Sequence, residues 1–340
     1  MKTILITGVA GFIGYHLAYR LLKSKNNIIV GLDNLNSYYD INLKVSRLKI
    51  LKKYSNFKFI KLDIKKGPEL KKIFQRYEPK YIINLAAQAG VRYSLENPKL
   101  YLESNIIGFF NLLDLSRIYK VNHFVYASTS SVYGANKKQP FKESDTADHP
   151  IQFYAATKRS NEIMAHSYSC LYNIPTTGLR FFTVYGPWGR PDMALFKFVK
   201  NILNKKHINV FNFGNHSRDW TYIDDIVNGI LKALYNVPKG TKNKKFFFSR
   251  SINPSISNSP FQIYNLGNSN PINLLKYIKI IEKILAKKSK IKFFPLQKGD
   301  VISTKASLKK VKDDLGYKPK VSAQTGIKNF INWYKSYYNS

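Results

Sequence analysis

The feature that most constrains the fold of this chain is a glycine-rich turn that joins its first apolar run to its first helical stretch. The run KTILITG leads into Gly8, Gly11 and Gly14, with two residues between successive glycines. Glycine permits the tight turn and lets the amides of a helix N-terminus approach a pyrophosphate. Asp33 ends the second apolar run, where its carboxylate would bind both hydroxyls of an adenosine ribose and repel a 2′-phosphate. The pattern predicts a site for NAD rather than NADP; a turn that serves only helix packing is the alternative.

Short apolar runs alternate with helical stretches through the first 135 residues. The runs suit strands that are covered on both faces, and the intervening stretches suit helices. Such alternation predicts an α/β fold, a doubly wound parallel sheet of the Rossmann type, over residues 1–180. Asp63, in the third run, is either a second cofactor contact or an ordinary strand-end acid. The runs span 2–8, 27–33, 57–64, 81–87 and 123–129, and the expected helices span 15–24, 68–77 and 100–119.

The pattern loosens in the second half of the chain. Residues 181–340 are expected to form mainly a second, smaller mixed α/β domain that binds the substrate and is interleaved with the first. Helices are expected over 274–285 and 323–338, and the segment near 209–236 is expected to return to the first domain. Residues 238–260 are rich in Lys, Ser, Asn and Pro and are expected to form a surface insertion.

The formal net charge of +35 suggests a nucleic-acid-binding protein, but the kind of basic residue argues against this class. The chain has 45 Lys and only 10 Arg, dispersed along the sequence, whereas base and phosphate recognition favours the guanidinium fork. We therefore expect no nucleic-acid partner. No apolar run reaches the roughly 18 residues of a membrane span and no signal-cleavage pattern begins the chain, so we expect no membrane partner and a cytoplasmic location. Cys170 is the only cysteine and the histidines are scattered, so no metal site is expected.

A tyrosine and a lysine four residues apart supply the candidate catalytic pair. Roughly three such pairs are expected by chance in a chain so rich in both, and several occur, among them Tyr19/Lys23, Tyr54/Lys58 and Tyr154/Lys158. Only the last follows a strand that ends in hydroxyls, at residues 128–131. On a helix this spacing places the ammonium beside the phenol, which would lower the phenol's pKa from about 10 toward neutrality. The alternative is an amphipathic surface contact.

Longer sequence motifs that are typical of one family occur over nearly the whole chain, and residues 238–260 are the main segment without such a motif. They are TGVAGFIG, NLAAQAGVRYS, STSSVYG, YAATK, LRFFTVYGPWGRPDMA and RDWTYIDDIV. With them the chain resembles the extended short-chain dehydrogenase/reductase family, among its NAD-dependent epimerases and dehydratases. Within that family it is most similar to the UDP-glucuronate 4-epimerases.

The resemblance implies an isomerase that converts UDP-glucuronate to UDP-galacturonate with tightly held NAD. Tyr154 would take the proton of the sugar 4-hydroxyl, Thr129 would share a hydrogen bond with it, and Lys158 would hold the nicotinamide ribose. The C4 hydride would pass to NAD and return to the opposite face of a transient 4-keto sugar. The implied cofactor-binding residues are Gly8, Gly11, Phe12, Ile13, Gly14, Asp33, Asn34, Asp63, Ile64, Leu85, Ala86, Ala87, Asn105, Ser128, Tyr154, Lys158 and Phe181.

The residues after Thr129 bear on the reaction. Related dehydratases have an Asp-Glu pair there and related decarboxylases have Glu at the second position, whereas this chain has Ser130 and Ser131. Without a carboxylate beside C5, proton abstraction from C5 lacks a base. Arg190 offers a bidentate fork for a carboxylate or diphosphate, or is a surface arginine. The implied substrate-binding residues are Arg92, Thr129, Ser130, Ser131, Thr183, Arg190, Arg218, Gln297 and Asp300.

Several alternatives remain at this stage. One is a 4-epimerase for UDP-glucose or UDP-N-acetylglucosamine, and another is a related decarboxylase or dehydratase. A third is a non-catalytic nucleotide-binding or nucleic-acid-binding protein that reuses the fold. The resemblance also implies a homodimer that pairs through the helices holding Asn111 and Met164, and a role in polysaccharide biosynthesis.

Overall fold

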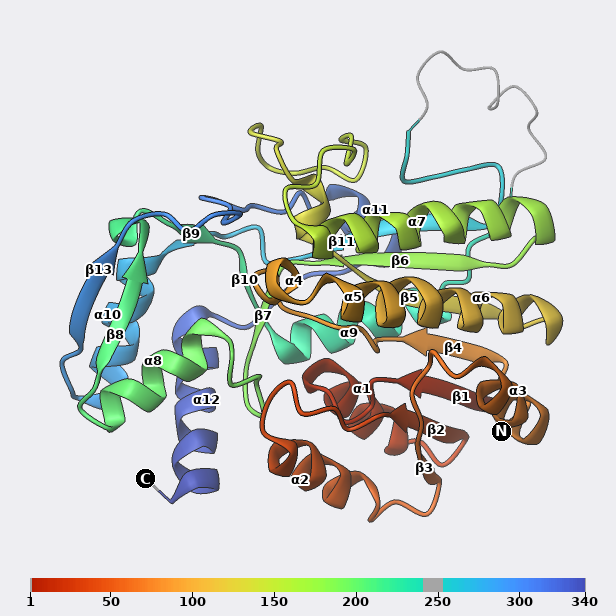
Figure 1. Ribbon diagram of the computed structural model, residues 1–340, viewed down its shortest axis with the longest axis horizontal. Helices are drawn as coiled ribbons and strands as arrows, with labels where there is room; N and C mark the ends of the chain where they lie inside the picture. The colour runs from red at the N-terminus through yellow and green to blue at the C-terminus, as the bar shows by residue number, and fades with distance from the viewer. Residues whose placement is uncertain (1, 241–252, 340) are drawn as a thin grey trace.

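A seven-stranded parallel sheet forms the centre of the molecule (Figure 1). The computed structural model describes residues 2–240 and 253–339. The strands lie in the order β11-β6-β5-β4-β1-β2-β3, which confirms the predicted doubly wound parallel sheet. Their bounds are β1 (Lys2–Thr7), β2 (Asn27–Asp33), β3 (Phe57–Lys61), β4 (Tyr81–Asn84), β5 (His123–Thr129), β6 (Thr176–Phe181) and β11 (Phe261–Leu266).

Helices cover both faces of the sheet because successive strand residues point to opposite faces and both sets are apolar. The flanking helices are α1 (Phe12–Leu22), α2 (Ile41–Leu51), α3 (Gly67–Tyr77), α6 (Gly108–Ile118), α7 (Phe153–Tyr172) and α9 (Ile223–Tyr235). Along β1, Ile4 and Ile6 pack into a core shared with α1 and α9, whereas Leu5 packs into a core shared with α3 and α6.

The helix expected over residues 100–119 is divided in the structure. It consists of α5 (Pro98–Tyr101), a π-helical segment (Leu102–Ile107) and α6, preceded by the short α4 (Tyr93–Glu96). A continuous apolar pattern does not show whether hydrogen bonds run to the fourth or the fifth residue, so the sequence could not reveal this break.

The smaller region lies beyond the carboxyl ends of the strands, and Figure 1 shows α8, α10, α12, β8 and β13 gathered there. The helices predicted over 274–285 and 323–338 have those bounds, because Asn273 and Ser322 each accept a hydrogen bond from a backbone amide of the first turn. The elements of the smaller region are β7 (Thr183–Tyr185), α8 (Ala194–Leu203), β8 (His207–Phe211), β9 (Ser217–Arg218), β10 (Trp220–Tyr222), β12 (Ile272–Asn273), α10 (Leu274–Leu285), β13 (Lys290–Phe294) and α12 (Ala323–Tyr338). Helix α11 (Lys309–Leu315) packs instead against β11 and α9.

The two regions are interleaved along the chain. Helix α9 packs against α1, and β11 pairs with β6 although it lies within residues 181–340, which were predicted to form mainly the second domain. A six-residue apolar run near the end of a chain carries no signal of which sheet it joins, so this membership was not predicted. We propose a first domain of residues 1–180 together with α9 and β11. Of the expected insertion at 238–260, residues 241–252 lie outside the described part of the chain.

Within residues 2–240 and 253–339, no helix is both long enough and apolar enough to cross a bilayer.

Candidate functional site

A cavity of about 800 Å³ opens at the carboxyl ends of the sheet strands, between the sheet and the smaller region. This volume lies in the range typical of sites for small molecules. Gly8, Asp33 and Tyr154 line it from the sheet side, whereas Phe211 and Arg218 line it from the other. All the predicted cofactor- and substrate-binding residues line this cavity except Asn105 and Gln297.

Asn105 lies behind the lining of the cavity and hydrogen-bonds to residues that support it. Its side-chain amide donates to the backbone oxygen of Gln88 and to Thr157 Oγ1, both at 3.1 Å, and its oxygen accepts from the Gln88 amide at 2.8 Å. The residue therefore ties the loop after β4 to α7. Gln297 lies in the loop that carries Asp300, but only Asp300 reaches the lining.

The glycine-rich turn leaves no room for side chains. A Cβ on Gly14 would lie 2.2 Å from the Gly8 oxygen, and one on Gly8, where φ is 69°, would lie 2.8 Å from the Ala86 amide nitrogen. Asp33 is fixed beside the turn, because its carboxylate accepts from the amides of Ala10 at 3.1 Å and Leu35 at 2.9 Å. A close-packed turn beside a fixed acid at the end of β2 fits the pyrophosphate and ribose of a dinucleotide.

Tyr154 and Lys158 lie on α7 and Thr129 ends β5, so two separated parts of the sequence meet in the lining of the cavity. Burial raises the pKa of Tyr154 above its ordinary value of 10, while Arg190 and a hydrogen bond with Thr129 lower it. The sequence predicted a pKa lowered by Lys158. Desolvation outweighs the neighbouring charges, and the cation that acts on the phenol is Arg190.

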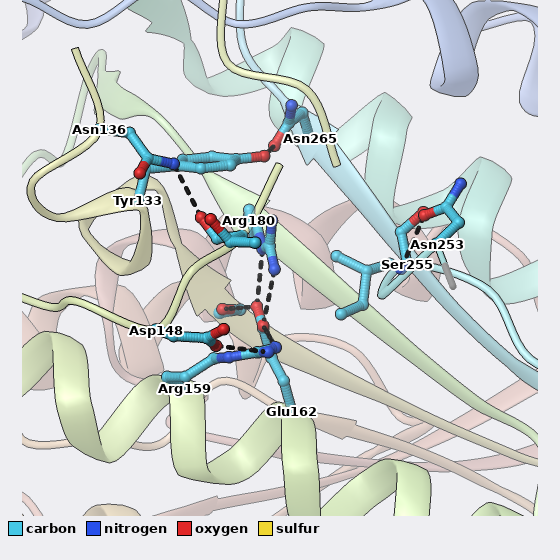
Figure 2. Close-up of polar contacts among 12 residues, drawn as sticks. Tyr133, Asn136, Asp148, Arg159, Glu162, Arg180, Asn253, Ser255 and Asn265 are labelled. Atoms are coloured by element: carbon cyan, nitrogen blue, oxygen red, sulfur yellow. Dashed lines mark hydrogen bonds and ion pairs between the residues drawn. The ribbon is translucent and has the colours of Figure 1, made fainter. Parts of the chain in front are cut away.

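Beneath these residues lies a buried ion pair that the sequence analysis did not identify (Figure 2). Glu162, one turn after Lys158 on α7, accepts from Arg180 Nε at 2.9 Å and Nη2 at 2.8 Å, and from Ser128 Oγ at 2.6 Å. Arg159 Nη1 also donates to Glu162 at 3.0 Å, and the same guanidinium pairs with Asp148. The network ties α7 to the ends of β5 and β6. In the sequence, the ion pair is indicated only by a charged residue within each of two segments, Glu162 in α7 and Arg180 in β6.

Lys158 is 2% exposed, and burial lowers its pKa to about 8 although Glu162 opposes this shift. In the unfolded chain a lysine has a pKa of about 10.4 and stays protonated between pH 8 and pH 10, whereas Lys158 in the folded protein loses its proton over this range. The unfolded state then binds more protons, so folding stability rises as the pH increases from 8 to 10. We expect Lys158→Met to stabilise the cofactor-free protein by roughly 2 kcal/mol at pH 7, because no ammonium must then be buried. The rise in stability above pH 8 should also shrink, measured by urea denaturation at several pH values.

Part of the rise in stability above pH 8 should remain in Lys158→Met, because burial lowers the pKa of Lys310 to about 8 as well. Lys279→Met, at an exposed position in the middle of α10, is the control and should leave the pH profile of stability unchanged. An unaltered profile for Lys158→Met would contradict the assignment of a buried ammonium.

At the far end of the cavity the arginines already have partners. Arg190 forms a bidentate pair with Asp192, an acid that the sequence analysis did not single out. Arg92 donates to Asp300 at 2.9 Å and lies over the ring of Phe211 at 4.8 Å. Arg218 Nη1 donates to the backbone oxygen of Ile302 at 2.9 Å. The sequence predicted arginines here, but not that carboxylates of the chain hold two of them.

Comparisons with known proteins identify the relatives of this chain. The family model described as the NAD dependent epimerase/dehydratase family matches residues 4–247. "Protein CapI" of Staphylococcus aureus is 49% identical over 335 residues, covering 98% of this chain and 99% of the relative. A "Probable UDP-glucuronate 4-epimerase" of Rhizobium meliloti is 45% identical over 334 residues, covering 98% and 97%. A crystal structure of UDP-glucuronic acid 4-epimerase from Bacillus cereus, with UDP-glucuronic acid and NAD, is similar with a TM-score of 0.88 and 33% identity, covering 99% and 100%.

Proposed function

Because this chain belongs to the NAD-dependent epimerase/dehydratase family, we propose that it interconverts UDP-glucuronate and UDP-galacturonate by NAD-dependent 4-epimerisation. One observation carries the proposal. One cavity is lined by the glycine-rich turn and Asp33, by Tyr154 and Thr129, and by Arg218 of the smaller region, and β1 and β4 lie between the strands that end in Asp33 and Thr129. This lining suits a dinucleotide and a nucleotide sugar bound side by side.

Tyr154 Oη is the proton acceptor for the sugar 4-hydroxyl, and Thr129 Oγ1 orients that hydroxyl. Bound NAD would supply a reversible acceptor for the C4 hydride. Lys158, one turn after Tyr154 on α7, would hold the hydroxyls of the nicotinamide ribose. Burial favours the protonated form of Tyr154, and the positive charge of Arg190 opposes this effect by favouring the ionised form that accepts the proton. Tyr154 Oη returns the proton to the C4 oxygen after the sugar has turned over.

The carboxylates of the cavity favour epimerisation over dehydration. Those in the lining are all engaged: Asp33 with the amides of Ala10 and Leu35, Asp63 with Asn34, Asp192 with Arg190, and Asp300 with Arg92. Ser130 and Ser131, which follow Thr129 in the lining, offer hydroxyls and no carboxylate. No lining carboxylate is left free to abstract the C5 proton, which dehydration requires.

The test has two parts. Denaturing the purified protein should release NAD, identified by chromatography, and incubation with UDP-glucuronate should give UDP-galacturonate, followed by proton NMR. Turnover of UDP-glucose or UDP-N-acetylglucosamine at the same rate would favour an epimerase for neutral sugars. Release of carbon dioxide or a 6-deoxy product as the main outcome would contradict epimerisation.

We also propose a homodimer that pairs through α6 and α7. Ile107, Phe110 and Ile118 are 48%, 46% and 46% exposed along one side of this helix pair, and Ile163 is 56% exposed on α7. Exposed apolar side chains gathered on neighbouring helices mark an interface more often than a solvated surface. Phe110→Asp should therefore convert the dimer to a monomer in sedimentation velocity.

The control for that experiment is Phe213→Asp, because Phe213 is 58% exposed on the smaller region, away from α6 and α7. It should leave the sedimentation coefficient unchanged. A wild-type monomer, or a dimer that survives Phe110→Asp, would contradict the proposed interface.

We also propose a cellular compartment and a metabolic role for the enzyme. We place it in the cytoplasm, since Cys170, the single cysteine, leaves no intrachain disulfide to require an oxidising compartment. We place its product in polysaccharide biosynthesis, for which uronic acids are building blocks.

A further inference from the structure

A bidentate ion pair between two residues of the chain, Arg190 and Asp192, lies in the lining of the cavity. Arg190 Nε donates to Asp192 Oδ1 at 2.9 Å and Nη2 donates to Oδ2 at 2.5 Å, and the two side chains are only 23% and 27% exposed. Tyr38 Oη donates to Asp192 Oδ2 at 3.3 Å, and its ring lies 5.9 Å from the guanidinium. Lys197 on α8 also faces Asp192. The carboxylate is therefore held in one orientation, against the fork of Arg190.

This pair lies where its charge acts on the reaction. Arg190 and Asp192 line the same cavity as Tyr154, Thr129, Ser131 and Thr183. Arg190 is near enough to lower the pKa of Tyr154, whose hydroxyl contacts the reacting carbon's oxygen in the proposed function. The C5 carboxylate of a uronate is adjacent to that carbon, so an unpaired Arg190 would meet it.

A salt bridge to that carboxylate would oppose epimerisation. Between loss and return of the hydride the sugar must present its opposite face, so its C5 substituent has to move. A bidentate guanidinium–carboxylate pair is among the strongest polar contacts in proteins and would hold the substituent in place. Such binding stabilises the bound sugar before and after the step, which lowers KM without raising kcat.

We propose that Asp192 is an internal counter-ion that keeps Arg190 from forming a salt bridge with the substrate's carboxylate, so that neutral hydroxyls hold it instead. The inference rests on the proposed function. Ser131 and Thr183 exchange hydrogen bonds at small cost as the sugar turns, whereas a buried ion pair would have to break. Asp192 thus acts through Arg190 and is a positioning residue that sets how the enzyme handles uronates.

The test is Asp192→Asn, which removes the charge and keeps the shape. We expect both KM and kcat for UDP-glucuronate to fall by about tenfold, the scale of one charge-assisted hydrogen bond. Values for UDP-glucose should stay within about twofold, because that sugar has no carboxylate. In the Tyr154→Phe background, where no turnover interferes, calorimetry should show tighter binding of UDP-glucuronate but not of UDP-glucose.

Asp192→Glu should keep wild-type behaviour because it keeps the charge. Asp148→Asn is the matched control, since Asp148 pairs with Arg159 on the surface and lies outside the cavity lining. Asp192→Ser replaces the Asn variant if that variant does not fold. A raised KM for UDP-glucuronate, or equal losses of kcat for both sugars, overturns the proposal. If the wild type does not turn over UDP-glucuronate, the proposed function fails, while the binding comparison still decides the role of Asp192.

Discussion

We expect Tyr154→Phe to lower epimerase turnover by about a thousandfold, within the range that a positioned acid or base contributes to catalysis. The ring of Tyr154 packs edge-on against Tyr101 with centroids 6.1 Å apart, and Phe can keep this contact. The variant loses only the hydroxyl that exchanges the proton with the sugar. It should therefore retain its bound NAD and its melting temperature, measured by dinucleotide release and calorimetry.

The chain supplies its own control for this experiment. Tyr19 on α1 and Lys23 at its C-cap have the same spacing, and the Lys23 ammonium lies 5.0 Å from the centre of the Tyr19 ring, yet neither lines the cavity. Tyr19→Phe should leave turnover near the wild-type value. Equal losses in the two variants, or near-normal turnover of Tyr154→Phe, would remove Tyr154 from its proposed role.

The second large effect concerns stability. We expect Glu162→Gln to lower the free energy of unfolding by about 3–5 kcal/mol, because it leaves the guanidinium of Arg180 buried without a counter-charge. The side chains of Glu162 and Arg180 are both fully buried. Arg180 also lies 4.8 Å from the ring centre of Tyr133, which cannot replace a carboxylate. Urea denaturation followed by circular dichroism measures the loss.

Glu103→Gln is the matched substitution on the surface. Glu103 pairs with Lys65 at 2.6 Å, with side chains 27% and 41% exposed, and such pairs contribute about 0–1 kcal/mol. We therefore expect Glu162→Gln to lower the free energy of unfolding much more than Glu103→Gln does. A loss below about 1 kcal/mol for Glu162→Gln would mean that water or another group compensates Arg180.

The parts of the molecule that could be predicted from the sequence are those set by neighbours along the chain. The glycine-rich turn, the strands around it and the capped helices at 274–285 and 323–338 follow from local spacing and from single capping residues. The cofactor end of the cavity could be predicted for the same reason, because a strand, a turn and an acid suffice to define it.

The rest depends on which distant segments meet. Glu162 finds Arg180 only because α7 crosses β6, and the pKa of Tyr154 depends on how much water the folded chain excludes. Asp192 looks like an ordinary loop acid until its distance to Arg190 is known. Periodicity and spacing carry no such distances, so ion pairs and desolvation were the features that the sequence could not supply.

The position of β11 has a consequence for the newly made protein. The outer edge of β6 carries unpaired amide and carbonyl groups until residues 261–266 have left the ribosome and bonded to it. Roughly three quarters of the polypeptide must therefore be synthesised before this edge is closed, and during that interval the nascent chain presents a site for mispairing with its neighbours.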